Sequence, residues 1–561
     1  MGSQESYMKS VDGVVKMRVG LLALLLALAL PHPSAMAGVM PPRAFAQSAE
    51  PPVSVTTNAA GNVLVDFGMA AFGWLEFTDS VPGEYELSLG EIVRDGAVWF
   101  APTNSCIRNV RLSGVAGRGR FRVPMRPNLR NTWAEGGAML LPDDIGVVMP
   151  FRAAEFARSP FPPTARNVRR VVVRYDYDLA ESSFRCSDER LNRIYDFCKR
   201  SIVNCSFCGL FVDSDRERLP YEGDSFAQQL ASYAVSSDPD IAAATFEHLM
   251  DHPTWPTEGK YSMVMIAWHD WEWMGRTNLV AKWYDRLVAE KLRGVRARSD
   301  GLLVSDHRTD LTDWPPRERD GFVFCPVNAS VNAYYARALA MMSDIARALG
   351  KNADAEAFAR EAEHVRRRYN EVFFDEVAGL YVDGEGTGHS SMHVNALALA
   401  FDLAPESRAS RIADFLVSKG PTGSPYFTHY LFYALLKAGR EDAVFDMILA
   451  SGDRSWLGMI DFGATLTLEA WNLKAKPNLD ANHAWACTPL PFVVRYVLGV
   501  NPTEPGSGRF AATPHLGPLE WAEGDVPTPS GTLHVRAAKR PDGTVETTCS
   551  GGGLQEKFAV R

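Results

Sequence analysis

The hydrophobic pattern of the chain changes its period at about Ser187, and this change limits the folds that are possible. Between residues 53 and 177, short segments alternate apolar and polar residues and are separated by turn residues. From Ser187 to about Val500 the apolar residues recur at helical spacing. After Pro502 the chain is rich in Gly and Pro and then β-like again. We therefore expect a multidomain α+β protein, with a helical domain flanked by an N-terminal β-sandwich and a small C-terminal β domain.

The helical region is expected to hold roughly ten to thirteen helices joined by short loops. Segments with helical spacing cover residues 225–235, 240–250, 277–295, 328–349, 353–372, 391–402, 427–438, 440–450, 463–471 and 484–498. An α-solenoid and a closed double ring of helices both suit such a region. A solenoid is built from repeats of fixed length, and no such repeat is found in this sequence. The pattern therefore favours the closed ring.

Composition excludes some classes of function. The chain has 561 residues, of which 46% are hydrophobic and 22% charged, so it can bury large cores. Its net charge of −9 offers no clustered basic surface for nucleic acid. Eight cysteines show no disulfide-dense spacing, and the CxxC at residues 205–208 has no second pair to complete a zinc site. We expect no metal and no cofactor.

The N-terminus carries the pattern of a secretory signal. Lys16 and Arg18 precede an apolar run at residues 19–30, which is too short to cross a bilayer. Small-residue cleavage sites end at Ala37 and Ala46, and the second is better placed. We expect an exported protein, periplasmic or secreted, without a membrane span once the leader is removed. The expected boundaries are 1–46 for the leader, 50–180 for the β-sandwich, 185–502 for the helical domain and 503–561 for the C-terminal domain.

An acidic stretch at residues 213–224 lies between two apolar segments. Its carboxylates are Asp213, Asp215, Glu217, Glu222 and Asp224. Arg216 and Arg218 are interleaved with them, and Pro220 and Gly223 exclude one continuous helix, so we expect a loop held against a core. Partial burial and adjacent arginines push carboxyl pKa values apart, as acid–base cleavage of a glycosidic bond requires. The alternative is an Arg–Asp network that only holds a loop in place.

A second carboxylate lies far downstream, in the predicted helix 463–471. Glu469 stands in an apolar stretch beside Trp471, and burying it is costly unless it has a partner or a task. Asn482 and His483 follow, either as site residues or as a helix cap. Aromatic candidates for a sugar cleft, some of which must be core, are Tyr221, Trp255, Trp268, Trp271, Trp273, Trp314, Trp456 and Trp485. Further polar candidates are Asp313, Glu318 and Asp320.

These segments resemble glycoside hydrolase family 78, the α-L-rhamnosidases. Residues 213–224, with Arg-Glu-Arg and then Gly-Asp after it, resemble the central motif of the family, and residues 463–483 resemble its second catalytic segment. The resemblance continues at residues 66–74 and 90–91, which resemble the β-sandwich of the family, at residues 184–195, which resemble its entry helix, and at residues 389–399 and 424–427. The resemblance covers most of residues 60–535 and implies an (α/α)6 barrel flanked by β-sandwich domains.

The resemblance also implies roles for individual residues. Glu217 matches the general acid of the family, and Glu469 matches the general base that activates water in an inverting hydrolysis. Asp224 matches a substrate-binding acid, and Asp313 with Trp314 resembles a sugar-contacting pair. Asp213 and Asp215 are both possible counterparts of the leading Asp of the family. The expected substrate-binding set is completed by Arg216, Tyr221, Trp268, Trp471 and His483.

We therefore expect an exported inverting glycosidase that removes terminal α-L-rhamnose, or a similar sugar, from glycosides or polysaccharides. Glu217 must then keep its proton near neutral pH, which needs an apolar wall such as Tyr221. The alternatives are a glycosidase for another sugar, a polysaccharide lyase on the same helical ring, and a non-catalytic glycan-binding protein. Two carboxylates on separate segments speak against the last of these, because binding alone does not need both.

Overall fold

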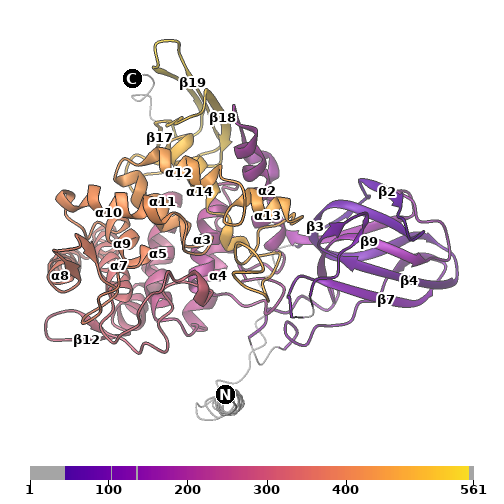
Figure 1. Cartoon of the computed structure of the whole chain (residues 1–561), viewed down its shortest axis with the longest axis horizontal. Coiled ribbons are helices and arrows are strands. Elements are labelled where there is room, and N and C mark those ends of the chain that lie inside the picture. Colours follow the sequence, from indigo (N-terminus) through magenta and orange to yellow (C-terminus); the bar gives the residue numbers. More distant parts are fainter. Residues whose placement is uncertain (1–44, 103, 134–136, 555–561) are drawn as a thin grey trace, which may run out of the picture.

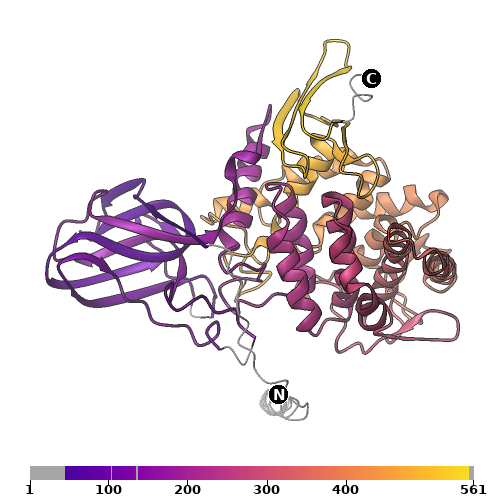
Figure 2. The same ribbon diagram turned by 180° about the vertical axis from the view of Figure 1, so that it is seen from behind.

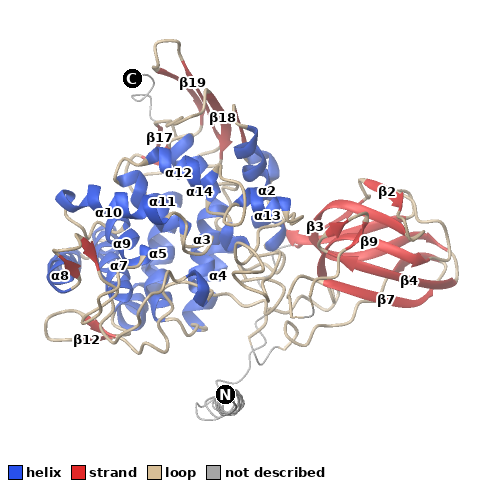
Figure 3. Ribbon diagram, in the orientation of Figure 1, coloured by secondary structure: helices blue, strands red, loops and turns tan. Residues whose placement is uncertain are grey.

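A computed structural model describes residues 45–102, 104–133 and 137–554 (Figure 1). A β-rich lobe lies at one end of the molecule and a larger helical body at the other, and a small sheet rises beside the helices (Figures 1 and 3). The view from behind shows the same separation (Figure 2). The multidomain arrangement of helices and sheets predicted from the periodicity is confirmed.

The β-rich lobe is an antiparallel eight-stranded sheet in the order β1-β10-β3-β9-β4-β7, with β2 and β8 also paired to β3. Its strands are β1 (Phe45–Glu50), β2 (Ser54–Thr57), β3 (Val63–Ser80), β4 (Gly83–Gly90), β7 (Asn109–Ala116), β8 (Gly119–Arg122), β9 (Met149–Arg158) and β10 (Val168–Tyr175). The long strand β3 is the centre of this sheet, because four other strands pair with it. Leu75 and Phe77 of β3 pack with Phe151 and Phe156 of β9 in the core of the lobe.

The helical body contains α2 (Glu189–Cys205), α3 (Glu222–Tyr233), α4 (Asp240–Asp251), α5 (Thr257–Met274), α6 (Thr277–Arg286), α7 (Ala329–Ala348), α8 (Asn352–Val372), α9 (Met392–Ala400), α10 (Glu406–Lys419), α11 (Thr428–Lys437), α12 (Glu441–Ile448), α13 (Trp456–Asp461) and α14 (Pro489–Phe492). Asp188, Asn328 and Ser391 begin α2, α7 and α9 by accepting hydrogen bonds from backbone amides of the first turn. Neighbours in space are α3 with α5, α5 with α7, α7 with α9, and α9 with α11, while α14 contacts α3. Every residue of α9 is buried, as expected for a helix enclosed by others.

The small sheet joins the two ends of the helical body. Its order is β11-β18-β19-β20, formed by β11 (Ser183–Cys186), β18 (Trp521–Val526), β19 (Leu533–Lys539) and β20 (Val545–Gly551). Strand β11 precedes α2 in the chain, so this sheet is not built from C-terminal residues alone. Short hairpins elsewhere are β5 (Val93–Arg94) with β6 (Ala97–Val98), β12 (Arg296–Ala297) with β13 (Leu303–Val304), β14 (Phe374–Asp375) with β15 (Leu380–Tyr381), and β16 (Val500–Pro502) with β17 (Phe510–Ala512).

The helix predicted at residues 463–471 is wrong. Its backbone amides bond across the fold instead of along a helix, since Thr467 donates to Ser201 Oγ and Glu469 donates to the Asp480 carbonyl. Gly463 has a φ of 98°, which a helix does not allow. The segment is thus an irregular but buried loop, and its apolar residues reflect burial and not helical periodicity.

Two other predicted helices are interrupted. Residues 484–498 form a short 3-10 turn, then α14, then a π-helical turn, with prolines at residues 489 and 491. The segment 277–295 is α6 followed by a π-helical turn at Leu287–Leu292. The helices α5 and α10 were not singled out from the sequence.

The β-rich lobe begins earlier than residue 50, because Phe45–Glu50 pairs with β10 as its edge strand β1. Residues 1–44, which hold most of the expected leader and the cleavage site that ends at Ala37, lie outside the described residues, whereas the second expected cleavage site ends at Ala46 within β1. Among the helices of the described residues, none is both long enough and apolar enough to cross a membrane.

Candidate active site

A cavity of about 240 Å³ lies where the loop 213–219 meets the first turns of α3 and α5; we call it the acidic cavity. Its acidic lining residues are Asp213, Glu217, Glu222, Asp224, Glu258, Asp313 and Glu469. Arg216 is the only lysine or arginine that lines it within the described part of the chain. The acidic stretch and the segment carrying Glu469, which are some 250 positions apart in the sequence, therefore meet in one space.

The loop 213–219 is closed on itself by its own first and last residues. Asp213 N donates to the Leu219 carbonyl over 2.8 Å, and Leu219 N donates to Asp213 Oδ1 over 3.0 Å. Arg218 has a φ of 55°, a left-handed conformation that costs an arginine free energy and is held by its surroundings. This closure presents Arg216 and Glu217 toward the cavity.

Asp215 is a buried residue of this loop and has partners both in the β-rich lobe and in the helical body. Arg108 Nε lies 2.7 Å from Asp215 Oδ2, and Arg218 Nη2 lies 2.6 Å from Oδ1. Asn131 Nδ2 donates to the Asp215 carbonyl over 2.5 Å, and Asp215 N donates to Asn482 Oδ1 over 2.8 Å. Every polar group of Asp215 thus has a partner, and two of those partners, Arg108 and Asn131, come from the N-terminal lobe.

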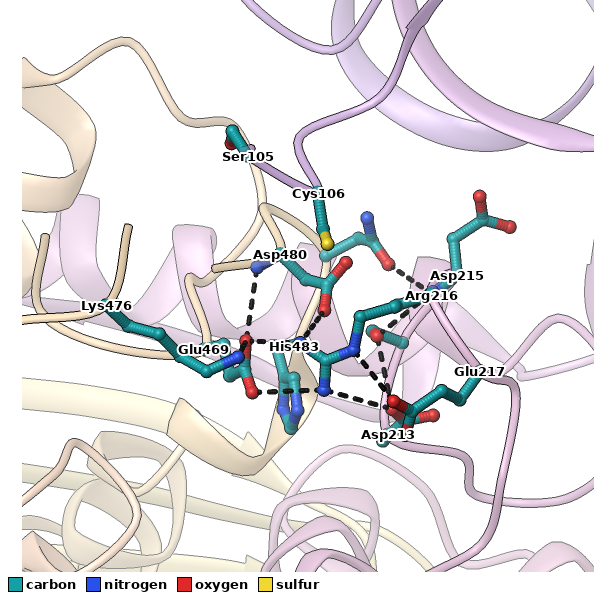
Figure 4. A network of polar contacts seen from close by, with 12 residues as sticks. Ser105, Cys106, Asp213, Asp215, Arg216, Glu217, Glu469, Lys476, Asp480 and His483 are labelled. Atoms are coloured by element: carbon teal, nitrogen blue, oxygen red, sulfur yellow. Dashed lines mark hydrogen bonds and ion pairs between the residues drawn. The ribbon is translucent and has the colours of Figure 1, made fainter. Parts of the chain in front are cut away.

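The guanidinium of Arg216 lies between the two carboxylates singled out from the sequence (Figure 4). Its Nε donates to Glu217 Oε1 over 3.1 Å, and its Nη1 and Nη2 donate to Glu469 over 3.0 and 3.3 Å. Nη1 also lies 3.0 Å from Asp480 Oδ2. Lys476 Nζ donates to Glu469 Oε2 over 2.7 Å. Arg216 Nη2 also lies 3.9 Å from Asp213 Oδ2, so two cations and four acidic side chains form one ion-pair network.

Charge pairing overcomes burial at Glu469. Burial by itself would raise the pKa of this carboxyl, but Arg216, His483 and Lys476 lower the pKa to about 2. Asp480, by contrast, has a pKa raised well above its usual range, because burial and the nearby Glu469 outweigh Arg216. Glu469 is the member of this pair that stays ionised at neutral pH.

Two other carboxyls in the cavity have raised pKa values. Burial raises the pKa of Asp213 well above its usual range, and burial together with the charge of Glu469 raises the pKa of Asp224 to about 8. Burial lowers the pKa of His483 to about 3, so its imidazole is neutral. Asp224 Oδ1 and His483 Nδ1 make no hydrogen bond to another described residue, and Asp224 Oδ1 lies 3.6 Å from His483 Nε2. These orphaned polar atoms suit hydroxyl groups of a bound ligand.

Aromatic rings form the walls and rim of the acidic cavity. Trp314 Nε1 donates to Glu469 Oε1 over 3.3 Å, and Tyr221 Oη donates to Glu217 Oε2 over 3.2 Å. Trp485 stacks on Tyr426 with ring centroids 5.3 Å apart. Trp255 lines the cavity and is 51% exposed, so a ring face remains free at the rim.

The structure brings together most of the residues expected at a site. Those lining the acidic cavity are Glu217, Glu469, Asp213, Arg216, Tyr221, Asp224, Asp313, Trp314 and His483. Three others do not line it. Asp215 holds the loop from behind, Trp471 is buried and donates to the Gly423 carbonyl, and Trp268 lies in a different cavity on the C-terminal half of α5.

Sequence reasoning missed the residues that surround the two carboxylates. Asp480 and Lys476 lie in a segment without periodicity, where no pattern marks a charged residue as buried. Glu91 follows β4 and is buried where the β-rich lobe meets the helical body. It accepts hydrogen bonds from Asn482 Nδ2 over 2.9 Å and from Arg108 N over 2.6 Å. The one sequence signal near Glu91 is the Gly90–Glu91 pair, whose resemblance to the family indicates the β-sandwich and not a site.

The described residues contain no group of three or more His, Cys, Asp or Glu side chains placed to hold a metal ion. Cys205 and Cys208 of the CxxC are both buried as free thiols. The acidic cavity is lined by carboxyls, which can transfer protons, and by the guanidinium of Arg216, which can stabilise negative charge.

Comparison with known proteins places this geometry in a family. Residues 180–497 match the model of the bacterial alpha-L-rhamnosidase six-hairpin glycosidase domain. An alpha-L-rhamnosidase of Alteromonas sp. (strain LOR) is 30% identical over 225 residues, covering 38% of this chain and 24% of that protein. An alpha-L-rhamnosidase of Formosa agariphila is 20% identical over 533 residues, covering 86% of this chain and 53% of that protein. The chain thus spans about half the length, or less, of these curated relatives.

Solved structures share the fold. An alpha-L-rhamnosidase from Dictyoglumus thermophilum superposes with a TM-score of 0.71 at 19% identity, covering 88% of this chain and 56% of that one. The Streptomyces avermitilis alpha-L-rhamnosidase complexed with L-rhamnose superposes with a TM-score of 0.72 at 18% identity, covering 91% of this chain and 49% of that one. Because the family model covers more than half of the sequence, the resemblance noted from the motifs is confirmed: the chain belongs to the bacterial alpha-L-rhamnosidase six-hairpin glycosidase family.

Proposed function

We propose that the protein is an exported inverting glycoside hydrolase that removes terminal α-L-rhamnose from glycosides or polysaccharides. The observation that carries the proposal is the pair Glu217 and Glu469, brought from separate segments to one cavity and held apart by Arg216. Membership of the rhamnosidase family supports the choice of sugar. The contacts of α3, α5, α7, α9 and α11 in series support an (α/α)6 arrangement of the helical domain. Export rests on the pattern of the N-terminal residues.

In this mechanism Glu217 protonates the leaving glycosidic oxygen, and Glu469 takes a proton from water on the opposite face of the sugar. The side chain of Glu217 is 37% exposed, so a glycosidic oxygen can reach it. Glu469 is ionised, as a general base must be, because Arg216 and Lys476 lower its pKa. Water attacks as the glycosidic bond breaks, so the anomeric centre inverts.

The sugar would be held by the groups that lack protein partners. Asp224 Oδ1 and His483 Nδ1 would bond ring hydroxyls, and the free face of Trp255 would contact the group beyond the cleaved bond. Asp313 is hydrogen-bonded to Ser424 and His393, which hold its carboxylate in place. It would therefore contribute a fixed wall of the cavity.

The test is hydrolysis of a chromogenic α-L-rhamnoside by the purified protein, with Glu217→Gln and Glu469→Gln measured beside it. Each variant should lose about 10²–10⁴-fold in kcat, the usual contribution of a general acid or base. Glu247→Gln is the matched control, since Glu247 pairs with Lys282 on the surface away from the cavity. A variant of either cavity glutamate that turns over like the control would remove that residue from the mechanism.

The products distinguish the proposal from its alternatives. Proton NMR during the first turnovers should show β-L-rhamnose, the inverted anomer, before mutarotation. Retention would contradict the assignment of Glu469 as base. An unsaturated, ultraviolet-absorbing product would indicate a lyase. Binding of rhamnosides without any turnover would indicate a glycan-binding protein.

A further inference from the structure

A second cavity, of about 380 Å³, lies at the other ends of the helices that form the acidic cavity; we call it the distal cavity. The acidic cavity uses the first turns of α3 and α5, whereas the distal cavity uses later turns of the same helices, including Phe226 of α3 and Trp268 of α5. Residues along the whole length of α11, from His429 to Lys437, complete its wall together with Arg337 of α7 and residues around α14. The proposed hydrolysis leaves this cavity without a role.

A layer of tyrosines separates the two cavities. Tyr334 and Tyr426 line the acidic cavity, and Tyr430 lines the distal one. The hydroxyls of Tyr426 and Tyr430 lie 3.0 Å apart, and the rings of Tyr334 and Tyr430 meet edge to face with centroids 5.7 Å apart. No residue lines both cavities among those the structure describes. A ligand in the distal cavity would therefore not compete with substrate for space.

The walls of the distal cavity are aromatic on several sides. Phe226, Trp268, Phe401 and Phe492 come from four different elements, and Tyr433 stands at the rim with 44% of its surface exposed. Such walls suit a flat ring, because aromatic faces bury a large area at a small entropic cost. A cavity of this size has room for one small molecule.

The polar groups of the distal cavity include donors without partners. No hydrogen bond to the ring nitrogens of His429 occurs in the described part of the chain, and burial lowers the pKa of this imidazole to about 3, so it is neutral. A neutral imidazole offers one donor and one acceptor. Arg337 lies 5.8 Å from the ring of Trp268, and its nearest carboxylate, Asp402 Oδ2, is 3.7 Å away, too far for a hydrogen bond.

The other charged groups in the lining are already satisfied. Glu272 accepts two hydrogen bonds from Arg495, at 2.9 and 2.7 Å, and lies 3.2 Å from His269 Nδ1. Lys437 donates to Asp402 and to the Ala400 carbonyl. Among the cations of the lining, Arg337 is the one whose side chain makes no hydrogen bond to another described residue, and its ion pair with Asp402 is long at 3.7 Å. A planar guanidinium with available donors is matched by a carboxylate.

We propose that the distal cavity binds a small ring that carries a carboxylate, either an aromatic acid or a uronic acid. The carboxylate would meet Arg337, the ring would lie against Trp268 and Tyr433, and a hydroxyl of the ring would bond His429. This inference does not depend on the proposed hydrolysis, because it concerns a separate space lined by other residues.

The test is titration calorimetry of the full chain with 4-hydroxybenzoate and with D-galacturonate, each beside an uncharged counterpart, 4-hydroxybenzyl alcohol and D-galactose. At least one of the two acids should bind at least about tenfold more tightly than its uncharged counterpart. The reason is that the counterpart has no carboxylate to form a charge-assisted hydrogen bond with Arg337. Binding of the first acid would indicate an aromatic acid as ligand, and binding of the second would indicate a uronic acid. Failure of both acids to bind would overturn the proposal.

Variants locate the binding. Arg337→Gln and His429→Phe should each weaken the bound acid by roughly tenfold. Arg347→Gln is the matched control, because Arg347 lies on the same helix, pairs with Asp344 at the surface and does not line the cavity. Should Arg337→Gln fold poorly, Tyr433→Ala at the exposed rim tests the same site. Binding that survives these changes but disappears on addition of L-rhamnose would belong to the acidic cavity and would contradict the inference.

Discussion

The acidic cavity and the distal cavity differ in the charged residues that line them. The acidic cavity lies at the N-terminal turns of α3 and α5, where Glu222, Asp224 and Glu258 occupy the first turns. The distal cavity lies toward C-terminal turns, where Lys437 ends α11. A helix dipole favours anions at its N-terminus and cations at its C-terminus. The exception is Glu272 near the end of α5, which is stabilised by Arg495.

The comparison also shows two ways of treating a buried charge. At the distal end, Glu272 has its own bidentate arginine, and burial does not prevent this ion pair from holding the pKa of Glu272 well below its usual range. At the acidic end, Arg216 is shared by Glu217, Glu469 and Asp480. Around this shared cation the pKa of Asp480 is raised, chiefly by burial, while the pKa of Glu469 is lowered by Arg216 against the effect of burial.

Removing the shared cation should have the largest effect. Arg216→Met leaves Asp480 and Glu469 buried with only Lys476 nearby, so the free energy of unfolding should fall by about 3–5 kcal/mol and hydrolysis should be lost. Denaturant unfolding and rhamnoside turnover measure the two effects. Arg216→Lys keeps the positive charge but loses the planar guanidinium, so its stability and turnover should lie between those of wild type and of Arg216→Met. Stability close to wild type in Arg216→Met would show that the carboxyls are not held by this residue.

Breaking the contact between the β-rich lobe and the loop 213–219 should have the next largest effect. Arg108→Met removes a partner of the buried Asp215 and should lower kcat by roughly tenfold while KM changes less, because the nearby Glu217 loses its position. Arg152→Met is the matched control: Arg152 pairs with Asp66 inside the same lobe. Equal kinetics in the two variants would mean that the lobe does not position the loop.

A smaller effect should appear in the pH dependence of stability. The pKa of Asp224 is raised to about 8 in the folded state, so between about pH 4 and pH 8 the folded protein holds a proton that the unfolded chain releases. The contribution of Asp224 to stability is therefore present below about pH 4 and is lost as the pH rises to about 8. Asp224→Asn should lose less stability than wild type over that range. Parallel unfolding curves for the two proteins would contradict the raised pKa.

The smallest expected effect concerns the layer between the cavities. Tyr430→Phe removes the hydroxyl that meets Tyr426 and should lower the free energy of unfolding by about 1 kcal/mol, the usual net value of one hydrogen bond. Tyr433→Phe is the control, since Tyr433 is half exposed at the rim. A much larger loss for Tyr430→Phe would indicate that the hydroxyl pair organises both cavities.

Local patterns predicted more of the fold than of the site. Period-two alternation and helical spacing identified the β-rich lobe and most helices, because each pattern reflects one buried face. The prediction of a helix at residues 463–471 was wrong because this segment is buried on both faces. An apolar run of that kind does not distinguish a helix from a packed loop. The spacing of residues 484–498 predicts one continuous helix, but the prolines at residues 489 and 491 interrupt it.

The sequence by itself determined the class of each region and the two segments that carry the proposed catalytic carboxylates, since motif and period are local properties. Only the tertiary structure decided what surrounds them: that Arg216 lies between Glu217 and Glu469, and that Trp268 faces the distal cavity instead. The reason is physical. Burial and charge pairing arise between residues far apart in the chain, and these two factors decide which carboxyl keeps its proton.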